Sequence, residues 1–473
     1  MRIQPFTGFI MVALSIASPG CVTSLVSCRQ LKNNQAETNR LNEASNMETF
    51  SLIEKNRIQV KELLHFPWNE PEGLPKIMTG NPLTSLIDKG EADVEQVIAA
   101  YRFRINETGS KIITLASDSH SVAGHFSTID FLLYNLESRL ARKIIIPLGD
   151  NLIEKSETVD FLLGKNDSFY LLERLITKEK KTISRLRCVE ASGKVVWEIE
   201  GKADPGNSET GAVLYGQCIA LLKEMGESVY LQAETATQTV IFKVDSKTGE
   251  TRKWLAIDNV VPKVFIDEHL NFRYATFIKE VNNRAYVCYN PNTAKQEILY
   301  ADSKSYACLG FPAALDAGNN LYCAEGLSIS CLSPRLLVKW KLSINNVILD
   351  SGRLFTSHFN EESKNLLICE WQENGSVVET MKVPLDLPGI RLGRLAGVVD
   401  PENFAIETYS QNNKMLQKYN IKAKTFDKLP EYSRIDKFHL QAAATWQIDK
   451  MGNIYLPVSS AEGFHIISVS VLP

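Results

Sequence analysis

The chain has 473 residues, of which 44 % are hydrophobic and 23 % are charged. This is the composition of a folded globular protein, and it excludes a disordered, collagen-like or coiled-coil chain. The formal net charge of −3, from 52 basic and 55 acidic residues, gives no broad positive field for nucleic acid. A mean hydropathy of −0.12 and a single apolar stretch near the start exclude a polytopic membrane protein.

The start of the chain has the pattern of an export signal. Residues 9–17 form an apolar run that suits a signal peptide and is too short to span a bilayer. Leu-Val-Ser at 25–27 precedes Cys28 and resembles the lipobox of bacterial lipoproteins, whereas the residues before Cys21 match it poorly. We predict a signal peptide over 1–27 and lipidation of Cys28. The address is then the bacterial cell envelope, periplasmic or at the cell surface, and plain secretion is the alternative.

The segment that follows Cys28 is polar. Residues 29–48 are rich in Asn, Gln and Glu and nearly free of large apolar side chains. Such a segment cannot bury enough surface to offset its ordering entropy. We predict a flexible tether over 28–48, with a short solvated helix as the alternative, and an N-terminal segment and linker over 49–95.

From residue 96 onward the chain repeats one pattern. An apolar run ends in a Gly, Asn or Asp turn, and a second run follows with an aromatic near its start, as in Asp316 to Tyr322 and Asp449 to Tyr455. Gly, Asn and Asp allow the positive φ of tight hairpins, and β-branched and aromatic residues favour strands. With the second strand as anchor, the units fall near residues 112, 170, 230, 273, 322, 355, 404 and 455.

The anchor spacing predicts the fold. Consecutive anchors lie 33 to 60 residues apart, and a four-stranded antiparallel unit at this period is typical of a β-propeller. We therefore predict an all-β chain with a propeller domain over 96–473 and eight blades. Seven blades is the alternative, because the unit near Arg273 has Glu268 to Asn271 in place of the usual Gly turn.

The last unit ends one strand short of four. Residues 57–66 alternate in the manner of a strand and can supply the missing outer strand, which would close the propeller from the N-terminal side. The alternative is an amphipathic helix over residues 50–64.

Three predicted outer strands carry a tryptophan after a turn, at Trp197, Trp254 and Trp340. The first, in Gly193-Lys194-Val-Val-Trp197, resembles the repeat of the quinoprotein (PQQ)-like propellers. The resemblance implies that these tryptophans dock between adjacent blades. The same superfamily includes an eight-bladed lipoprotein of the outer-membrane β-barrel assembly machinery. Quinoprotein dehydrogenases also carry a vicinal cysteine pair, which this sequence lacks, so we predict no cofactor.

Other candidate chemical groups give weaker signals. His120 and His125 lie in a predicted loop, and His358 lies in a second loop, but their spacing is not a standard zinc signature. Exposed loop histidines are the simpler interpretation, and we predict no metal site. Without Cys21 and Cys28, seven cysteines remain, an odd number that most simply reflects small core residues.

The sequence contains no Gly-rich phosphate loop, no nucleophile elbow and no metalloprotease motif. We therefore predict a binding or scaffold module that takes an envelope protein, a peptide or a glycan on one face. It would be monomeric, attached to the membrane through its lipid alone, and would not bind nucleic acid. The alternative is an enzyme of the lactonase, lyase or glycan-processing kind with its site in the central channel. Carboxylates or histidines that converge on the channel would favour the enzyme.

Overall fold

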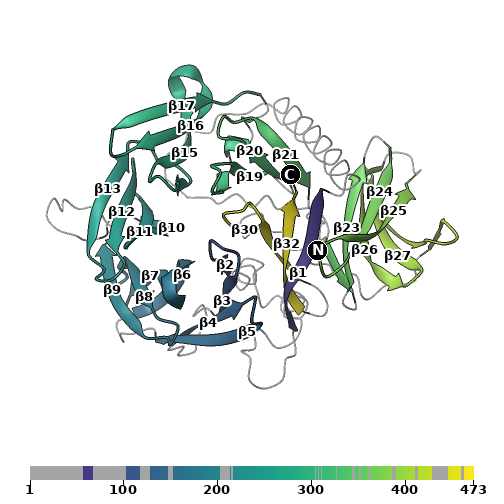
Figure 1. Ribbon diagram of the computed structural model, residues 1–473, viewed down its shortest axis with the longest axis horizontal. Coiled ribbons are helices and arrows are strands. Elements are labelled where there is room, and N and C mark those ends of the chain that lie inside the picture. The colour runs from purple at the N-terminus through teal and green to yellow at the C-terminus, as the bar shows by residue number, and fades with distance from the viewer. Residues whose placement is uncertain are drawn as a thin grey trace, which may run out of the picture. The chain divides into compact units, whose positions relative to one another are not determined.

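The structure is a computed structural model that describes residues 57–67, 103–117, 128–147, 153–202, 217–303 and, with short gaps, 305–428 and 446–472, together with Leu214. These residues form eight four-stranded antiparallel sheets (Figure 1). The predicted all-β propeller of eight four-stranded units is therefore confirmed. Within the described residues, no helix is both long and apolar enough to cross a membrane.

Seven sheets are consecutive in the chain. Sheet 1 contains β2 (Phe103–Ile105), β3 (Lys111–Ser117), β4 (Thr128–Asn135) and β5 (Leu140–Pro147). Sheet 2 contains β6 (Ile153–Leu163), β7 (Phe169–Thr177), β8 (Thr182–Val189) and β9 (Val195–Lys202). Sheet 3 contains β10 (Gln217–Met225), β11 (Ser228–Glu234), β12 (Thr239–Asp245) and β13 (Thr251–Ile257). Sheet 4 contains β14 (Val264–Ile266), β15 (Phe272–Ile278), β16 (Asn283–Asn290) and β17 (Lys295–Tyr300).

The remaining sheets follow the same plan. Sheet 5 contains β18 (Pro312–Leu315), β19 (Leu321–Glu325), β20 (Ser328–Leu332) and β21 (Val338–Ser343). Sheet 6 contains β22 (Val347–Asp350), β23 (Arg353–Asn360), β24 (Asn365–Trp371) and β25 (Val377–Pro384). Sheet 7 contains β26 (Ile390–Asp400), β27 (Asn403–Ser410), β28 (Lys414–Asn420) and β29 (Thr425–Lys428). The closing sheet contains β1 (Ile58–Pro67), β30 (Gln447–Ile448), β31 (Ile454–Ser459) and β32 (Gly463–Val471). Three short 3-10 helices, η1 (Lys165–Asp167), η2 (Lys279–Val281) and η3 (Cys308–Gly310), lie in the connections.

All eight predicted anchors lie on the second strand of a sheet, counted from its innermost strand. The anchor aromatics Tyr170, Tyr230 and Phe355 are buried between sheets, in apolar layers with residues of neighbouring strands. Sheets 2, 3 and 6 each take part in two such layers, one on each face, which explains why their central strands carry apolar residues on both faces.

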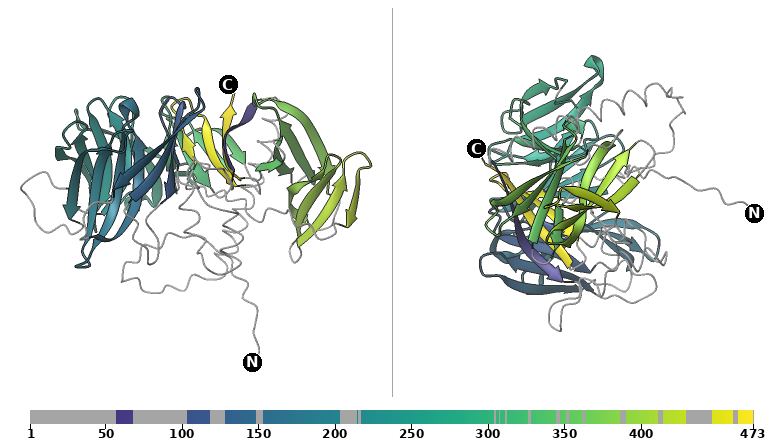
Figure 2. Two further views of the ribbon diagram at one scale, coloured as in Figure 1. Left: turned by 90° about the horizontal axis from the view of Figure 1, so that it is seen from below. Right: turned by 90° about the vertical axis from the view of Figure 1, so that its right-hand side faces the viewer.

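The closing sheet joins two distant parts of the chain. β1 pairs with β32 from Ile58 opposite Val471 to Pro67 opposite Gly463. The Arg57 guanidinium also donates hydrogen bonds to the carbonyl oxygen of Leu472. In Figures 1 and 2, the purple strand β1 lies beside the yellow strand β32. The predicted closing strand is confirmed, and the alternative helix is wrong for residues 58–64. The ladder satisfies backbone groups that would otherwise be an open edge.

Three hairpins between first and second strands share one carboxylate-centred turn. In the closing sheet, Asp449 Oδ1 accepts the N–H groups of Met451 and Asn453, and Oδ2 accepts the Tyr455 hydroxyl at 2.9 Å. Asp316 in sheet 5 accepts the Asn320 N–H and the Tyr322 hydroxyl, and Asp267 in sheet 4 accepts the N–H groups of His269 and Asn271, which are subsets of the same relative positions. These acidic residues therefore serve turn chemistry.

The same turn explains why the fourth unit is hard to recognise. Leu270, with φ of 61°, takes the left-handed position that Gly452, with φ of 86°, fills in the closing sheet. Arg273 Nε donates to Asp267 Oδ2 where the closing sheet uses a tyrosine hydroxyl. The hairpin geometry is kept although both signature residues differ.

Polar side chains of one sheet accept backbone N–H groups from the innermost strand of the next sheet. Asp160 Oδ2 accepts the Leu221 N–H at 2.9 Å, and Gln232 Oε1 accepts the Val264 N–H at 2.9 Å. These bonds satisfy donors on the free edges of β10 and β14. The closing sheet also makes backbone bonds to its neighbours: Lys450 N donates to Glu107 O of sheet 1, and Lys450 O accepts from Ala317 N of sheet 5.

Candidate functional site

The first predicted docking residue, Trp197, lies on the outer strand β9 and contacts sheet 3. Its indole is 9 % exposed, and Nε1 donates to the Ser246 carbonyl oxygen at 2.9 Å. The ring also lies against Gly249, where an added Cβ would approach it to 3.0 Å. Within its own sheet the indole lies beside the Tyr170 ring, with centroids 6.0 Å apart. Trp197 therefore lies between two sheets.

Trp254 and Trp340 have related but looser settings. Each packs edge-on against a second-strand tyrosine of its own sheet, Tyr230 and Tyr322 respectively, with ring centroids 5.7 Å apart. The Lys243 ammonium lies 4.5 Å from the Trp254 ring centroid. Both indoles are half-buried.

Of the candidate histidines and the predicted lipidation site, the structure describes only His358. Cys28, His120 and His125 lie outside the described residues. His358 lies on β23 and is buried, not in an exposed loop, and its Nε2 is 3.1 Å from Thr356 Oγ1. The three histidines considered in the sequence are therefore not brought together within the described part of the chain.

A different set of ligand-type side chains meets on the closing strands. Glu62 and His65 belong to β1, and His465 belongs to β32 directly opposite His65. In a regular strand, residues three apart point to opposite faces. Here the register shifts between Glu62 and Leu64, and this bulge inserts one extra residue. The bulge therefore returns Glu62 and His65 to one face, the face that also carries His465.

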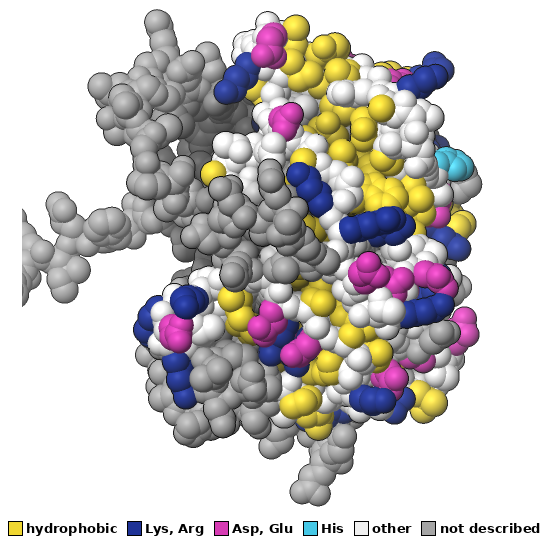
Figure 3. Space-filling model, turned by 90° about the vertical axis from the view of Figure 1, so that its left-hand side faces the viewer, with side chains coloured by type: hydrophobic (Ala, Val, Ile, Leu, Met, Phe, Trp, Pro, Cys, Tyr) yellow, Lys and Arg dark blue, Asp and Glu magenta, His cyan; other side chains and the backbone are white. Residues whose placement is uncertain are grey.

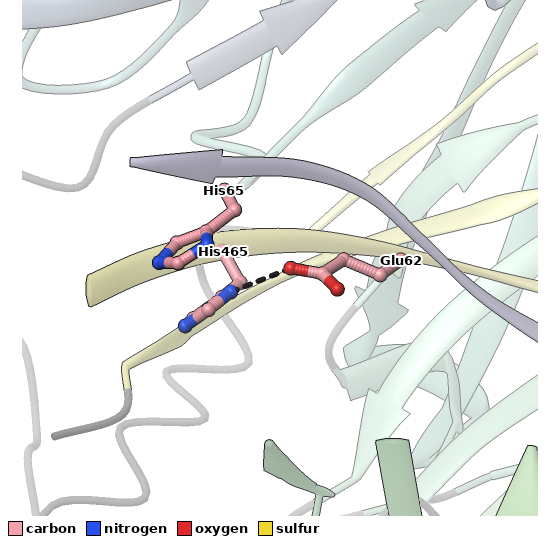
Figure 4. Close-up of side chains that lie close together, drawn as sticks. All are labelled: Glu62, His65 and His465. Carbon is pink, nitrogen blue, oxygen red and sulfur yellow. Dashed lines mark hydrogen bonds and ion pairs between the residues drawn. The ribbon is translucent and has the colours of Figure 1, made fainter. Parts of the chain in front are cut away.

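The three side chains are close and graded in exposure (Figure 4). The His465 Nδ1 atom lies 2.7 Å from Glu62 Oε1, and one ligand atom from each residue lies within 4.8 Å of the others. The two imidazole rings stack with centroids 4.2 Å apart. The His465 side chain is 2 % exposed, that of Glu62 is 29 % exposed, and His65 is exposed. One side of the cluster is therefore open to solvent.

This cluster was missed because its members lie about 400 residues apart in the sequence. The prediction that residues 57–66 supply the last outer strand contained the signal. Pairing that segment with residues 463–471 places the two histidines opposite each other in one register. The bulge is not visible in the sequence, so the position of Glu62 was not predictable.

A second charged group lies on the innermost strands. The Arg104 guanidinium on β2 donates to Asp160 Oδ1 and, at 3.0 Å, to the Phe161 carbonyl oxygen of β6. Lys263, just before β14, donates to the Ala313 carbonyl oxygen at 2.5 Å. Burial, the largest cause, and the nearby Arg104 cation together lower the pKa of Lys263 to about 8, and Asp160 opposes the change. The innermost strands β2, β6 and β18 and the connection before β14 are thus linked through two cations and one carboxylate.

Sheet 2 also contains a fully buried ionic cluster. The Glu173 carboxylate receives Arg185 Nε and Nη2, each at 3.1 Å, and lies 2.7 Å from Arg187 Nε. Ser156 Oγ donates to the same carboxylate at 3.1 Å, and Arg187 Nη1 donates to the Pro147 carbonyl oxygen of sheet 1. All three charged side chains are at most 3 % exposed. Their role is structural, because no open side is left for a ligand.

The seven described cysteines are free thiols. Cys323 pairs with Ser330 and Cys331 pairs with Tyr322, so the two cysteines of this hairpin do not face each other. Burial raises the pKa of Cys218 and of Cys369 to about 12, which keeps these thiols protonated and unreactive.

Comparisons with known proteins bear on the fold alone. Neither a protein-family model nor a curated protein matches the chain. Solved structures that resemble it include the WD40 domain of SCAP from fission yeast, at 8 % identity and a TM-score of 0.32, covering 78 % of this chain and 94 % of that one. The Dos1 propeller matches at 10 % identity and 0.35, covering 87 % and 96 %. The polysaccharide lyase Uly1 matches at 10 % identity and 0.31, covering 79 % and 90 %.

Proposed function

We propose that the chain is a lipid-anchored, extracytoplasmic β-propeller that binds a partner protein or peptide of the cell envelope. The observation that carries this proposal is a set of exposed apolar side chains on both faces of sheet 4 and in the connections beside it: the register places Ile298 and Tyr300 on one face and Phe277 on the other. They are 39 % to 53 % exposed: Phe277, Val281, Ile298, Tyr300 and Tyr306. Among the described residues, each of the other sheets exposes at most two large apolar side chains. We call this group the sheet 4 patch.

The sheet 4 patch has the chemistry of a protein-binding surface. Scattered exposed apolar residues are ordinary, but a local group with aromatic members is typical of the core of an interface. The Arg284 guanidinium lies 4.7 Å from the Tyr306 ring centroid and donates to the Tyr306 carbonyl oxygen at 2.9 Å, so this aromatic is held in place. Figure 3 shows apolar side chains exposed among charged ones on the side that carries sheets 2 to 4.

The innermost strands favour binding over channel catalysis. The buried Asp160 carboxylate accepts hydrogen bonds from Arg104, from the Phe161 N–H and from the Leu221 N–H. Its oxygens are therefore committed to joining sheets 1, 2 and 3. A general acid or base needs a carboxyl group that can reach a substrate. Among the described inner strands, no second buried carboxylate lies with it.

Site-specific photo-crosslinking tests the partner surface. A photoreactive phenylalanine analogue at position 300 should give a discrete crosslinked product in intact cells. The same analogue at Leu337 of sheet 5, which is 64 % exposed, is the matched control and should give none. Equal crosslinking at both positions, or none at position 300, would contradict the proposal.

Membrane fractionation tests the lipid anchor separately. Cys28→Ser should move the protein from the membrane to the soluble fraction, while Cys21→Ser should leave it on the membrane. The opposite pattern would show that lipidation occurs at Cys21. Retention of both variants would mean that the anchor is not a lipid on either cysteine.

The second candidate function is an enzyme that acts on an anionic substrate at the innermost strands. The observation that favours it is Lys263, whose pKa of about 8 suits a general base and which is influenced by the Arg104 cation. Lys263→Met should then abolish turnover of anionic polysaccharides, with position 300 crosslinking unchanged. Absence of turnover by the wild-type chain removes this candidate.

A further inference from the structure

We propose that Glu62, His65 and His465 bind one divalent transition-metal ion of the zinc class, and that this ion fastens β1 to β32. This site lies on the closing sheet, away from the sheet 4 patch, so its test is independent of partner binding.

The ligand set fits such an ion. Two imidazole nitrogens and one carboxylate oxygen are ligands that zinc prefers, and zinc sites with three protein ligands keep a fourth position for water. One ligand atom from each residue lies within 4.8 Å of the others. Ligands of one zinc ion lie about 2.0–2.2 Å from the metal, so the three groups must draw slightly closer together when they share an ion.

The backbone fixes the positions from which the three ligand side chains project. The His65–His465 pair is fixed by the β1–β32 register, and the bulge between Glu62 and Leu64 turns the carboxylate to the same face. The Nδ1 atom of the buried His465 lies 2.7 Å from Oε1 of the Glu62 carboxylate. Bulges often serve to aim a side chain at a functional site. The exposed His65 leaves the open side on which water completes the coordination.

Metal binding at this place has a structural consequence. In the unfolded chain the ligands from β1 and β32 are about 400 residues apart, so a preformed site exists only in the folded state. An ion that binds only the folded state stabilises it in proportion to its concentration and affinity. The ion would also close a very long chain loop, the position where a crosslink gains most.

Calorimetric titration of the full chain with Zn²⁺, after treatment with a chelator, tests the proposal. We expect one site per chain, a higher unfolding temperature with Zn²⁺, and reversal by EDTA. Co²⁺ should bind with the visible absorption of a tetrahedral site. His65→Gln and Glu62→Gln should each weaken Zn²⁺ binding at least about tenfold and abolish the thermal shift. Because His65 is exposed, its variant should keep the metal-free unfolding temperature of the wild type.

Two controls locate the ion. His269→Gln changes an exposed histidine in the turn before β15 and should bind Zn²⁺ as the wild type does. The double variant His120→Gln, His125→Gln should also bind normally. Loss of binding in that double variant would place the ion there and overturn the proposal. Unchanged binding by His65→Gln, or no stoichiometric binding by the wild type, would overturn it as well.

Discussion

Sheet 2 and the closing sheet each hold a group of charged or titratable side chains, and they use it in opposite ways. In sheet 2, Glu173 is enclosed by Arg185 and Arg187, and all three are buried. In the closing sheet, Glu62 and His65 lie on the edge strand β1, and only His465 is buried. The position within the sheet decides the difference. Strands β7 and β8, which carry the sheet 2 cluster, have a paired strand on each side, whereas the edge strand β1 keeps one side unpaired.

The two clusters also differ in their chemistry. Arginine remains charged at any accessible pH, so the sheet 2 cluster is a permanent ionic structure with one carboxylate for two guanidinium groups. Histidine can lose its proton near neutral pH and then bind a metal ion. One cluster therefore holds the fold, and the other is able to respond to a ligand.

Matched Glu→Gln substitutions give the largest expected contrast. Glu173→Gln leaves two buried guanidinium groups without a carboxylate and should lower the free energy of unfolding by about 3–5 kcal/mol. Glu62→Gln in metal-free protein should cost less than about 1 kcal/mol, because that carboxylate is partly exposed. Urea unfolding of both variants measures the difference.

The exposed pair Glu179 and Lys181 at the tip of the β7–β8 hairpin provides the control within sheet 2. Their side chains are 73 % and 74 % exposed, and Glu179→Gln should leave the urea midpoint unchanged. Equal effects of Glu173→Gln and Glu62→Gln would mean that burial does not distinguish the two clusters.

The attachment of the two sheets to their neighbours gives the next contrast. Sheet 2 contacts sheet 3 through the Trp197 indole, whereas the closing sheet shares an apolar layer with sheets 5 and 6 and is also joined to sheets 1 and 5 by backbone hydrogen bonds of Lys450. Trp197→Ala should lower the free energy of unfolding by about 3 kcal/mol, near the lower end for a buried tryptophan, because the indole lies at the edge of its sheet. It should also speed hydrogen exchange around Gly249.

Trp371→Ala is the comparison for this prediction. That indole is buried, but its Nε1 donates to Thr356 Oγ1 of its own sheet at 2.9 Å. It should lower stability without changing exchange at Gly249. A Trp197→Ala protein with wild-type stability and lost ligand binding would instead identify Trp197 as an exposed stacking residue.

The repeats could be predicted because the residues that shape each hairpin lie close together in the sequence. The turn at Asp449 and the aromatic at Tyr455 are six residues apart, and the hydrogen bond between them is made within one hairpin. The unit at Arg273 was harder to recognise because Leu270 adopts the left-handed conformation without being glycine. Short-range turn chemistry therefore explains why the eight units could be predicted and why the unit at Arg273 was the hardest to recognise.

The candidate site could not be predicted in the same way. His65 and His465 meet only because β1 and β32 pair, and Glu62 joins them only because of a bulge. Likewise, no local pattern marks Glu173 and Arg187 as partners, and both are buried in the folded chain, where Arg187 also contacts sheet 1. Contacts between distant segments carry this information, and no local pattern encodes it.

The smallest expected effect concerns Lys263, which is linked to sheet 2 through Asp160 and has no counterpart in the closing sheet. Burial lowers its folded-state pKa to about 8 from the ordinary lysine value of 10.5. Between these values the unfolded chain holds a proton that the folded chain has lost, so stability from this group rises with pH; below pH 8 both forms are protonated and the slope vanishes. The gain should reach about 1–2 kcal/mol, since the side chain is only partly buried.

Urea unfolding of the wild type and of Lys263→Met between pH 7.5 and 10 measures the contribution of Lys263, as the difference between the two free energies of unfolding. The difference is required because burial raises the pKa of the Cys188 thiol to about 11, which lowers stability above pH 9 in both proteins. Lys263→Met should be more stable than the wild type at pH 7.5, and the gap should narrow as the pH rises. Lys61→Met, which changes an exposed lysine on β1, should show no such gap. A constant difference across the range would mean that Lys263 keeps its proton throughout and would contradict this prediction.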